Sequence, residues 1–595
     1  MTTYVAPIRD MLFAMNELAG LAEITALPGN EEVTPDLVEA ILDEAAKFAT
    51  EVLAPINAQG DRQGCMCKDG EVATADGFKA AYGKFIESGW NAMPASPDFG
   101  GQGLPSLVST AVLEMWKASN MAFSLCQMLT LGAVAAIAHH GSDRDKQLYL
   151  PKMVSGEWTG TMNLTESQAG SDLSAVRSRA EPEGDHYRIS GTKIFITWGE
   201  HDMAENIIHM VLARLPDAPE GTKGISLFVV PKFLVNADGS LGRRNDLVCA
   251  SIEHKMGIHG SPTAVMAFGE NDGAIGYLVG EANHGLACMF TMMNHARLNV
   301  GLEGVAISER AYQQALGYAR ERVQSRPIGA TGAAAVAIIR HPDVRRMLMN
   351  MKARIEAMRA LAYFTAAQMD KALSHPDPEE RKKRQAITDL LTPVVKGWCT
   401  ENAIDITSTG IQVHGGVGFI EETGACQHMR DARITTIYEG TTGIQANDLI
   451  GRKVARDKGA AMKLLLSEVA DTLAALDAAG DEELRLMGES LQGGTLALEK
   501  ATGWLLANYD RAPASAAAGA VPYLKLFGTV VGGWLMARAA LVAATKLKTD
   551  AAGFYSAKIT TARFYSEHVL PEALAYGQAI VNGSGSVLAL DESLF

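Results

Sequence analysis

A single glutamate, Glu439, lies in the segment RDARITTIYEGTTGIQANDLIGRK (residues 430–453), where most of its nearest neighbours are apolar or carry hydroxyl groups. A carboxylate in such surroundings loses part of its hydration, which raises its pKa and makes it a stronger base. A lone glutamate in a loop can equally be structural. The segment on its own therefore only suggests a general base.

Three further segments contain residue types that suit a flat or phosphorylated ligand. NLTESQAGSD (163–172) combines small residues with hydroxyls, and the paired Gly415 and Gly416 of IQVHGGVGF (411–419) allow close backbone approach. GTKIFITWGE (191–200) predicts a strand that places Phe195 and Thr197 on one side. The Gly415 segment lacks the strand-first GxGxxG layout, so we do not expect a nicotinamide-binding fold. Taken singly, each segment could be an ordinary loop or strand.

Composition and charge narrow the class of protein. The chain has 595 residues, of which 47% are hydrophobic and 20% charged, and this length predicts about four globular units. A net charge of −15 argues against nucleic-acid binding, which requires basic residues that neutralise phosphates. The seven scattered cysteines and the absence of a leader-like N-terminus predict a cytoplasmic protein without a metal site. The apolar stretch 526–537 is shorter than the roughly 20 residues that span a bilayer, so we expect a buried helix and no membrane span.

Apolar residues have helix-like spacing in the N-terminal and C-terminal parts of the chain and strand-like patterns between them. This order predicts a mainly α chain with a central β domain. Helical spacing is clear in 38–56 and 107–139, and short β-rich runs occupy 186–197, 206–215 and 224–234. In the C-terminal region, Gly480, Gly493–Gly494 and Ala514–Ala518 are expected to be inter-helix turns. The expected domains are an N-terminal extension (1–34), a helical domain (35–160), a β domain (161–280), a helical bundle (281–455) and a C-terminal helical domain (456–595).

Together, in this order and spacing, the four segments resemble the acyl-CoA dehydrogenase family over residues 40–455. Thr165 to Asp172 is similar to the family's TEPGAGSD stretch, with Ser167 and Gln168 in place of Pro-Gly, and Phe195-Ile196-Thr197 resembles its WIT-like strand. Further matches are Lys255-Met-Gly-Ile, Ser261-Pro-Thr, GEANHGL (280–286) and Ala296-Arg297. The resemblance implies an α-β-α architecture, to which the C-terminal helical domain of the family's longer members is appended.

The resemblance also implies roles for individual residues. The implied catalytic base is Glu439, because Ala296 occupies the other position where the family can place its glutamate. The implied FAD-binding residues are Met162, Leu164, Thr165, Phe195, Ile196, Thr197, Arg322, Gln412, Gly415, Gly416, Thr441 and Gly443. The implied acyl-CoA-binding residues are Ser171, Asn294, Arg297 and Gly440. Two residues around 325–327 are inserted after Arg322 relative to the common family pattern, so Arg322 is the firmer assignment in that stretch.

In the implied reaction, Glu439 removes the α-proton of an acyl-CoA thioester and FAD takes the β-hydride, which leaves a trans-2-enoyl-CoA. Hydrogen bonds from the Glu439 N–H and a flavin hydroxyl would stabilise the enolate charge. Electrons would then pass to an electron-transfer flavoprotein. In the family, Arg322, Gln412, Gly415 and Gly416 correspond to groups that bind FAD across a subunit interface, which implies a homo-oligomer, a dimer rather than a tetramer.

The sequence leaves the acyl group and three other functions open. Met121, Met162 and Met292 could line a pocket for a thioether-containing acyl group or simply belong to the core, and medium- or long-chain acyl groups are the alternative. An acyl-CoA oxidase would share the same proton and hydride steps. A nucleic-acid-associated flavoprotein would need a basic face, for which 381–384 is the conspicuous cluster, although a solvated helix start explains it equally. An exposed apolar stripe on the C-terminal domain would instead indicate membrane or partner docking.

Overall fold

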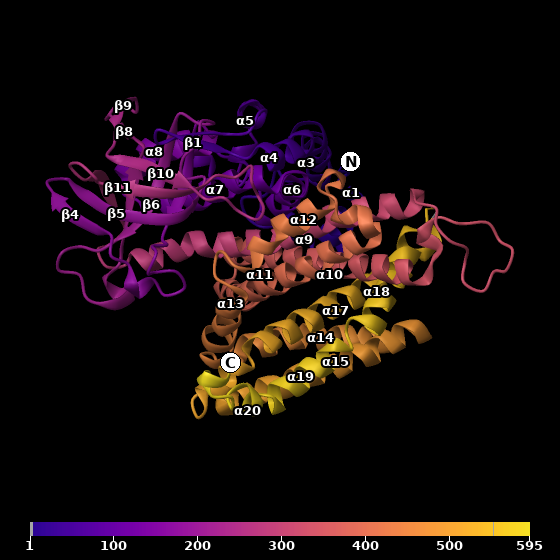
Figure 1. Cartoon of the computed structure of the whole chain (residues 1–595). Coiled ribbons are helices and arrows are strands. Elements are labelled where there is room, and N and C mark those ends of the chain that lie inside the picture. Colours follow the sequence, from indigo (N-terminus) through magenta and orange to yellow (C-terminus); the bar gives the residue numbers. More distant parts are fainter. Residues whose placement is uncertain (1–3, 551) are drawn as a thin grey trace. The chain divides into compact units, whose positions relative to one another are not determined.

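The computed structural model describes residues 4–550 and 552–595 (Figure 1). The first three residues of the expected N-terminal extension and residue 551 of the C-terminal domain lie outside the described residues. The chain forms two compact units, which are described separately below. The helical unit comprises Met1–Ala46, Pro105–Ala118 and Val300–Phe595, and the sheet unit comprises Lys47–Leu104 and Ser119–Asn299.

The sheet unit is built around one eight-stranded sheet. Its strands are β3 (Trp158–Asn163), β4 (Arg179–Glu183), β5 (His186–Thr197), β6 (Asn206–Ala213), β7 (Ser226–Pro231), β10 (Leu247–Ile252), β11 (Thr263–Phe268) and β12 (Ala274–Val279). The strand order is β10-β11-β5-β12-β7-β6-β3, and β4 pairs with β5. Only the β3–β6 pair is parallel among these neighbours. The remaining strands form the hairpins β1 (Met66–Lys68)–β2 (Glu71–Ala73) and β8 (Phe233–Val235)–β9 (Leu241–Arg244).

Helix α7 (Met121–His140) packs against β3 and is buried on nearly all sides. A Cβ atom added to Gly160 of β3 would lie 2.5 Å from Cβ of Ala133, so only glycine permits this approach. The segment 107–139, predicted to be helical, forms two helices, α7 and α6 (Ser106–Ser119), most of which belongs to the helical unit. Asn120 ends α6 and caps α7, because its side-chain oxygen accepts a hydrogen bond from the Phe123 N–H at 3.1 Å. The other helices of the sheet unit include α4 (Ala54–Gln63), α5 (Phe78–Glu87) and α8 (Asp143–Ser155).

Long helices dominate the helical unit. The central ones are α9 (Gly285–Glu321), which belongs to this unit from Val300 onward, α10 (Pro342–Ser374) and α11 (Pro378–His414). Short helices follow them, α12 (Ala425–Ala432) and α13 (Thr442–Asp448). The C-terminal region contains α14 (Ala460–Ala478), α15 (Glu482–Asn508), α16 (Pro513–Ala518), α17 (Ala520–Lys546), α18 (Phe554–His568), α19 (Glu572–Asn582) and α20 (Ser584–Val587). These are the orange-to-yellow helices of Figure 1, in which α17 contacts both α15 and α19.

Two expected inter-helix turns in the C-terminal region were wrong or incomplete. Gly480, with φ of +67°, does separate α14 from α15. Gly493 and Gly494, however, lie inside the continuous helix α15. An added Cβ on Gly494 would come within 3.2 Å of Leu570 and 3.3 Å of Val530, so this glycine serves close helix packing and not a turn. The alanine run 514–518 is itself the short helix α16.

A buried charge network joins distant segments of the helical unit. Arg359 of α10 pairs with Glu114 at 2.6 Å, Glu309 at 2.9 Å and Asp10 of α1 (Ile8–Phe13) at 2.5 Å, and it is 1% exposed. Lys558 of α18 also pairs with Asp10. Because an unpaired charge is costly to bury, these pairs fix the N-terminal segment and the C-terminal region to the same place on α10.

Two helices in the described part of the chain are long and apolar enough to cross a bilayer by length and composition. They are Met121–His140, with mean hydropathy 1.8, and Ala520–Thr549, with mean hydropathy 1.6. The apolar stretch 526–537 thus belongs to a longer helix than we expected. In each helix 83% of the apolar window is buried inside the protein. The prediction of a buried helix is therefore supported by this burial, and not by the short length of the apolar stretch on which it was based.

Candidate active site

Glu439 lies in the loop between a short helical turn (Arg433–Thr436) and α13. Its backbone is left-handed, with φ of +54°, and Gly440 follows with φ of +88°. A non-glycine residue in this region costs about 1 kcal/mol or more, and such strain persists only where the surroundings hold it. Strained positions of this kind cluster at functional sites.

Two buried side chains hold the two peptide groups that directly follow Glu439. The Lys396 Nζ donates to the Gly440 carbonyl at 2.7 Å, and the Gln445 Nε2 donates to the Glu439 carbonyl at 3.0 Å. Lys396 and Gln445 are both 0% exposed, whereas Glu439 is half-buried. The orientation of the two peptide planes that follow the candidate base is therefore set from within the protein.

The residue before Glu439 is anchored as well. The Tyr438 hydroxyl donates to Glu303, which also pairs with Lys117 at 3.1 Å, and the Lys117 and Glu303 side chains are fully buried. Burial raises the pKa of Tyr438 well above its usual value, and the neighbouring Glu303 carboxylate raises it further, so the phenol stays protonated and remains a donor. After the loop, the Thr441 side chain caps α13 by accepting from the Ile444 N–H.

The two segments expected to bind one side of the flavin are adjacent in the sheet unit. The Ile194 N–H donates to the Thr165 carbonyl at 2.9 Å, and the Lys193 Nζ donates to the Leu164 carbonyl at 3.1 Å. Met162 lies near the end of β3 and is buried. Residues 162–165 thus lie beside the strand that contains residues 195–197.

Strand β5 contains a bulge at its candidate flavin-binding end. Lys193 pairs with Met266 of β11, and Ile196 pairs with Ala264. Two residues of β5, Ile194 and Phe195, therefore lie opposite the single residue Val265. Buried positions therefore fall three residues apart, at Lys193 and Ile196. The strict alternation expected of a strand is interrupted between Lys193 and Ile196, whereas Phe195 and Thr197 both flank the buried Ile196. Phe195 has φ of +60° and is 59% exposed.

A buried ion pair supports this bulge. Glu166 and Lys193 are 2.8 Å apart, and Glu166 also accepts from the Arg177 N–H and from the Ser178 N–H and hydroxyl. Burial by itself would raise the pKa of Glu166, but the Lys193 charge and these hydrogen bonds outweigh it and lower the pKa to about 2. The sequence shows an acidic residue inside the TESQAGSD loop and a lysine in the following strand, but it does not show that the two side chains are in contact.

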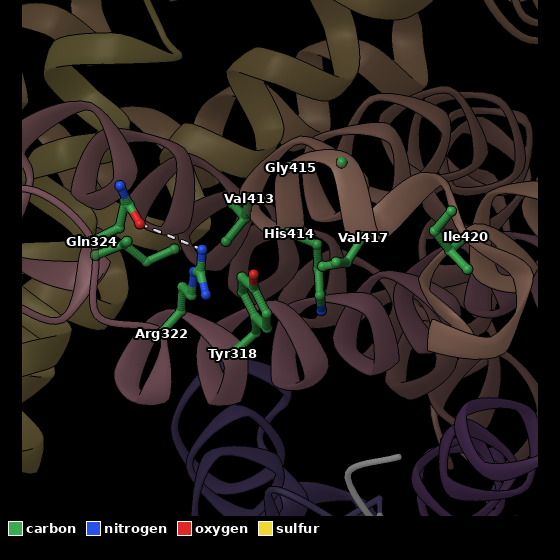
Figure 2. A pocket seen from close by; sticks show the side chains of 10 residues that line it. Tyr318, Arg322, Gln324, Val413, His414, Gly415, Val417 and Ile420 are labelled. Atoms are coloured by element: carbon green, nitrogen blue, oxygen red, sulfur yellow. Dashed lines mark hydrogen bonds between the residues drawn. The ribbon is translucent and has the colours of Figure 1, made fainter.

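A pocket of about 520 Å³ in the helical unit gathers Arg322, Gly415 and Gly416 (Figure 2). The Arg322 Nη2 donates to the Gln324 side chain at 3.4 Å. Tyr318 stacks on His414 with ring centroids 4.7 Å apart. A Cβ atom added to either glycine would have no other atom within 4 Å. Gln412 is exposed near the end of α11 and is not among the residues that line the pocket.

The remaining predicted residues divide between the two units. Gly440, Thr441 and Gly443 lie with Glu439 in the helical unit. Ser171, Asn294 and Arg297 lie in the sheet unit. Ser171 and Asn294 are exposed. Arg297 is only 5% exposed, with its guanidinium 5.9 Å from the centre of the Phe290 ring.

The chain is similar to curated proteins along almost its whole length. It is 48% identical to 3-methylmercaptopropionyl-CoA dehydrogenase of Ruegeria pomeroyi over 98% of this chain and 99% of that protein. It is 37% identical to a butyryl-CoA dehydrogenase of Syntrophomonas wolfei, over 100% and 99% of the two chains. It is 34% identical to a broad-specificity linear acyl-CoA dehydrogenase of Mycobacterium tuberculosis, over 100% of both.

Solved structures agree with this similarity. An acyl-CoA dehydrogenase of Bacillus anthracis, solved in complex with FAD, has the same fold, with a TM-score of 0.72 and 22% identity over 98% of this chain and 93% of that chain. A chain from a structure titled for the electron transferring flavoprotein of Acidaminococcus fermentans is 26% identical over 70% of this chain and 97% of its own, with a TM-score of 0.56.

Family models match four consecutive parts of the chain. Those of the acyl-CoA dehydrogenase N-terminal, middle and C-terminal domains match residues 35–157, 161–270 and 283–455. A model described as acetyl-CoA dehydrogenase C-terminal like matches residues 465–591. The resemblance inferred from the four segments is confirmed, and the chain belongs to the acyl-CoA dehydrogenase family of oxidoreductases that act on CH–CH donors.

Proposed function

We propose that this acyl-CoA dehydrogenase uses Glu439 as the general base that removes the α-proton of the acyl thioester. The observation that carries the proposal is the strained Glu439 backbone, whose own carbonyl and that of Gly440 are held by Gln445 and Lys396. A base must be held near its productive geometry to act efficiently, and such strain is maintained where it serves function.

The residues present fit the FAD that the family implies. Leu164 and Thr165 lie beside the bulged strand that exposes the Phe195 ring. The pocket at Arg322 offers a cation beside Gly415 and Gly416, where nothing fills the space a Cβ would take. These residues would hold FAD, which when bound accepts the β-hydride of the substrate.

Within this reaction the chain itself supplies a proton acceptor and a fixed geometry. Glu439 takes the α-proton, and exclusion of water by the bound thioester strengthens the carboxylate as a base. The Glu439 N–H donates to the thioester carbonyl and stabilises the enolate charge that develops there. Gln445 and Lys396 hold the two peptide groups that follow Glu439, and Tyr438, which precedes the Glu439 N–H, is anchored on Glu303. The product is a trans-2-enoyl-CoA.

For the substrate we propose 3-methylmercaptopropionyl-CoA, which would give 3-methylthioacryloyl-CoA. The support is the 48% identity to the Ruegeria pomeroyi enzyme of that name over nearly the whole chain. Met121, Met162 and Met292 are all buried in the sheet unit, as either a thioether-tolerant pocket or a core would require. Medium- or long-chain acyl-CoA is the alternative, supported by the similarity to the butyryl-CoA and linear acyl-CoA dehydrogenases.

We further propose that electrons pass to an electron-transfer flavoprotein and that the enzyme is a cytoplasmic homodimer. The similarity to the Acidaminococcus fermentans chain supports the first proposal. The open pocket at Arg322 supports the second, because the family resemblance assigns it to FAD shared between subunits. Peroxide formation during turnover would indicate an oxidase instead. Light scattering of the FAD-loaded protein distinguishes a dimer from a tetramer or a monomer.

The proposed base and substrate are tested by anaerobic flavin bleaching. The purified FAD-loaded protein and its Glu439→Gln variant are mixed separately with 3-methylmercaptopropionyl-CoA, butyryl-CoA, octanoyl-CoA and palmitoyl-CoA. We expect fastest bleaching with the first thioester and a loss of at least about 10³-fold in the variant. Glu489→Gln, which removes an exposed carboxylate of α15, is the matched control and should bleach like wild type. Equal bleaching by Glu439→Gln would refute the base assignment.

A further inference from the structure

We propose that the C-terminal helical domain is part of the catalytic apparatus, and that Lys525 of α17 is a positioning residue for the Glu439 loop. The proposal rests on Glu439 being the base. It assigns a role to a region that contains none of the residues implicated in binding or chemistry above.

A short chain of polar contacts runs from this domain to the loop. The Lys525 Nζ lies 3.2 Å from a carboxylate oxygen of Glu401 in α11. The other oxygen of Glu401 accepts a hydrogen bond from the Thr442 hydroxyl at 2.7 Å. Thr442 is the first residue of α13, three positions after Glu439, and is 8% exposed. A side chain of the C-terminal domain therefore acts on the catalytic loop through one intermediary.

Close helix packing places α17 behind the same stretch of α11. An added Cβ on Gly397 would lie 2.7 Å from the Leu524 side chain, and one on Gly528 would lie 2.2 Å from the Trp398 ring. Gly397 directly follows Lys396, which holds the Gly440 carbonyl, and Glu401 is one helical turn further on. One helix of the C-terminal domain thus supports both α11 side chains that contact the loop.

The charge of Lys525 favours the position in which Glu401 accepts from Thr442. Lys525 and Glu401 are 34% and 29% exposed, so their attraction is partly screened by solvent. Replacing Lys525 by glutamate would bring two carboxylates together and push Glu401 away from Thr442. Since neither Lys525 nor Glu401 is a predicted ligand of substrate or FAD, the change should slow the chemical step without weakening substrate binding.

The test measures the rate of flavin reduction at saturating thioester, and the apparent Kd for that thioester, by anaerobic stopped flow on the full-length FAD-loaded protein. For Lys525→Glu we expect a rate about fivefold lower with a Kd within about twofold of wild type. Lys525→Arg should restore the wild-type rate. Lys548→Glu makes the same charge change at an exposed position beyond the end of α17 and should leave the rate unchanged.

A double-mutant cycle identifies the route. In a Thr442→Val background, Lys525→Glu should slow reduction by clearly less than fivefold, because the contact it disturbs is already absent. A wild-type rate in Lys525→Glu, an equal loss in Lys548→Glu, or full additivity with Thr442→Val would each overturn the proposal. If Lys525→Glu does not fold, Lys525→Met removes the attraction without adding repulsion, and a rate about twofold lower is then required.

Failure of this inference is distinguishable from failure of the proposed function. If Glu439→Gln is reduced as fast as wild type, Glu439 is not the base, whatever the Lys525 variants show. If Glu439→Gln is inactive while Lys525→Glu reacts like wild type, the base assignment holds and only the role of the C-terminal domain is refuted.

Discussion

The Glu439 loop and the bulge at Phe195 both contain a strained backbone, but different kinds of contacts stabilise them. Each holds a non-glycine residue at positive φ, and each uses a buried lysine that donates to a loop carbonyl, Lys396 in one and Lys193 in the other. Around Phe195 the ion pair and its hydrogen bonds come from residues 164–193, beside the paired strand β11. Around Glu439 they come from several helices widely separated in sequence.

This difference shows where each loop is vulnerable. The bulge is stabilised by a nearby ion pair, Glu166–Lys193, so it can form with the sheet itself. The Glu439 loop depends on α6, α9 and α11 through Lys117, Glu303 and Lys396, so its geometry requires the complete helical unit. We therefore expect substitutions around Glu439 to affect the rate of reaction most, and substitutions around Phe195 to affect stability most.

Among the residues that hold these two segments in place, the largest effect should come from substituting Lys396 by Met. The variant loses a charge-assisted hydrogen bond worth about 1.5–3 kcal/mol, and the peptide that follows Gly440 becomes free to rotate. If this bond is needed in the transition state, kcat should fall about 10-fold to 100-fold. Steady-state kinetics with the best thioester measure the loss. Lys383→Met, at an exposed position on the same helix, is the control. An unchanged kcat in Lys396→Met would mean that the loop does not need this anchor.

An intermediate effect, on stability, should come from Glu166→Gln. Breaking the buried pair leaves Lys193 without its counter-charge and should cost about 3 kcal/mol at pH 7. Because the pKa of Glu166 in the folded protein is about 2, below its unfolded value, the pair stabilises the protein above about pH 4.5 and loses this contribution as the pH falls toward 2.

Urea denaturation at several pH values checks this sign. The difference between wild type and Glu166→Gln should be greatest near neutral pH and should shrink in acid. Glu183→Gln removes an exposed partner of Arg188 and should change the denaturation midpoint little at any pH. A difference that grows in acid would contradict the assignment of an ionised pair.

The smallest effect should be a difference in stability between alanine substitutions at two adjacent glycines of the Arg322 pocket. Backbone conformation alone should cause this difference. Neither Gly415 nor Gly416 has an atom within 4 Å of an added Cβ, but only Gly415 has a positive φ, of +64°. Gly415→Ala should therefore lower the free energy of unfolding by about 1 kcal/mol, and Gly416→Ala should not lower it. Thermal unfolding of the FAD-free protein measures both. Equal effects would show that backbone strain is not the cause.

Much of the fold was predictable because it follows from local periodicity. The strand 186–197 was predicted with its observed bounds, and the region 281–455, expected to be a helical bundle, contains the long helices α9, α10 and α11. Predictions failed where a residue serves packing and not local structure. Gly494 lies inside a helix because Leu570 and Val530 approach it closely, and Asn120 divides an apolar run by capping a new helix.

The sequence by itself determined the family and singled out Glu439, because the four segments are short continuous motifs whose order and spacing survive without any knowledge of contacts. Only the tertiary structure identified the groups that hold Glu439. Lys117, Glu303, Lys396 and Lys525 are separated from it by 43 to more than 300 residues, and a lysine or glutamate inside a helix carries no local sign of its partner. The partners are decided by helix packing, which brings these side chains together only when the chain is folded.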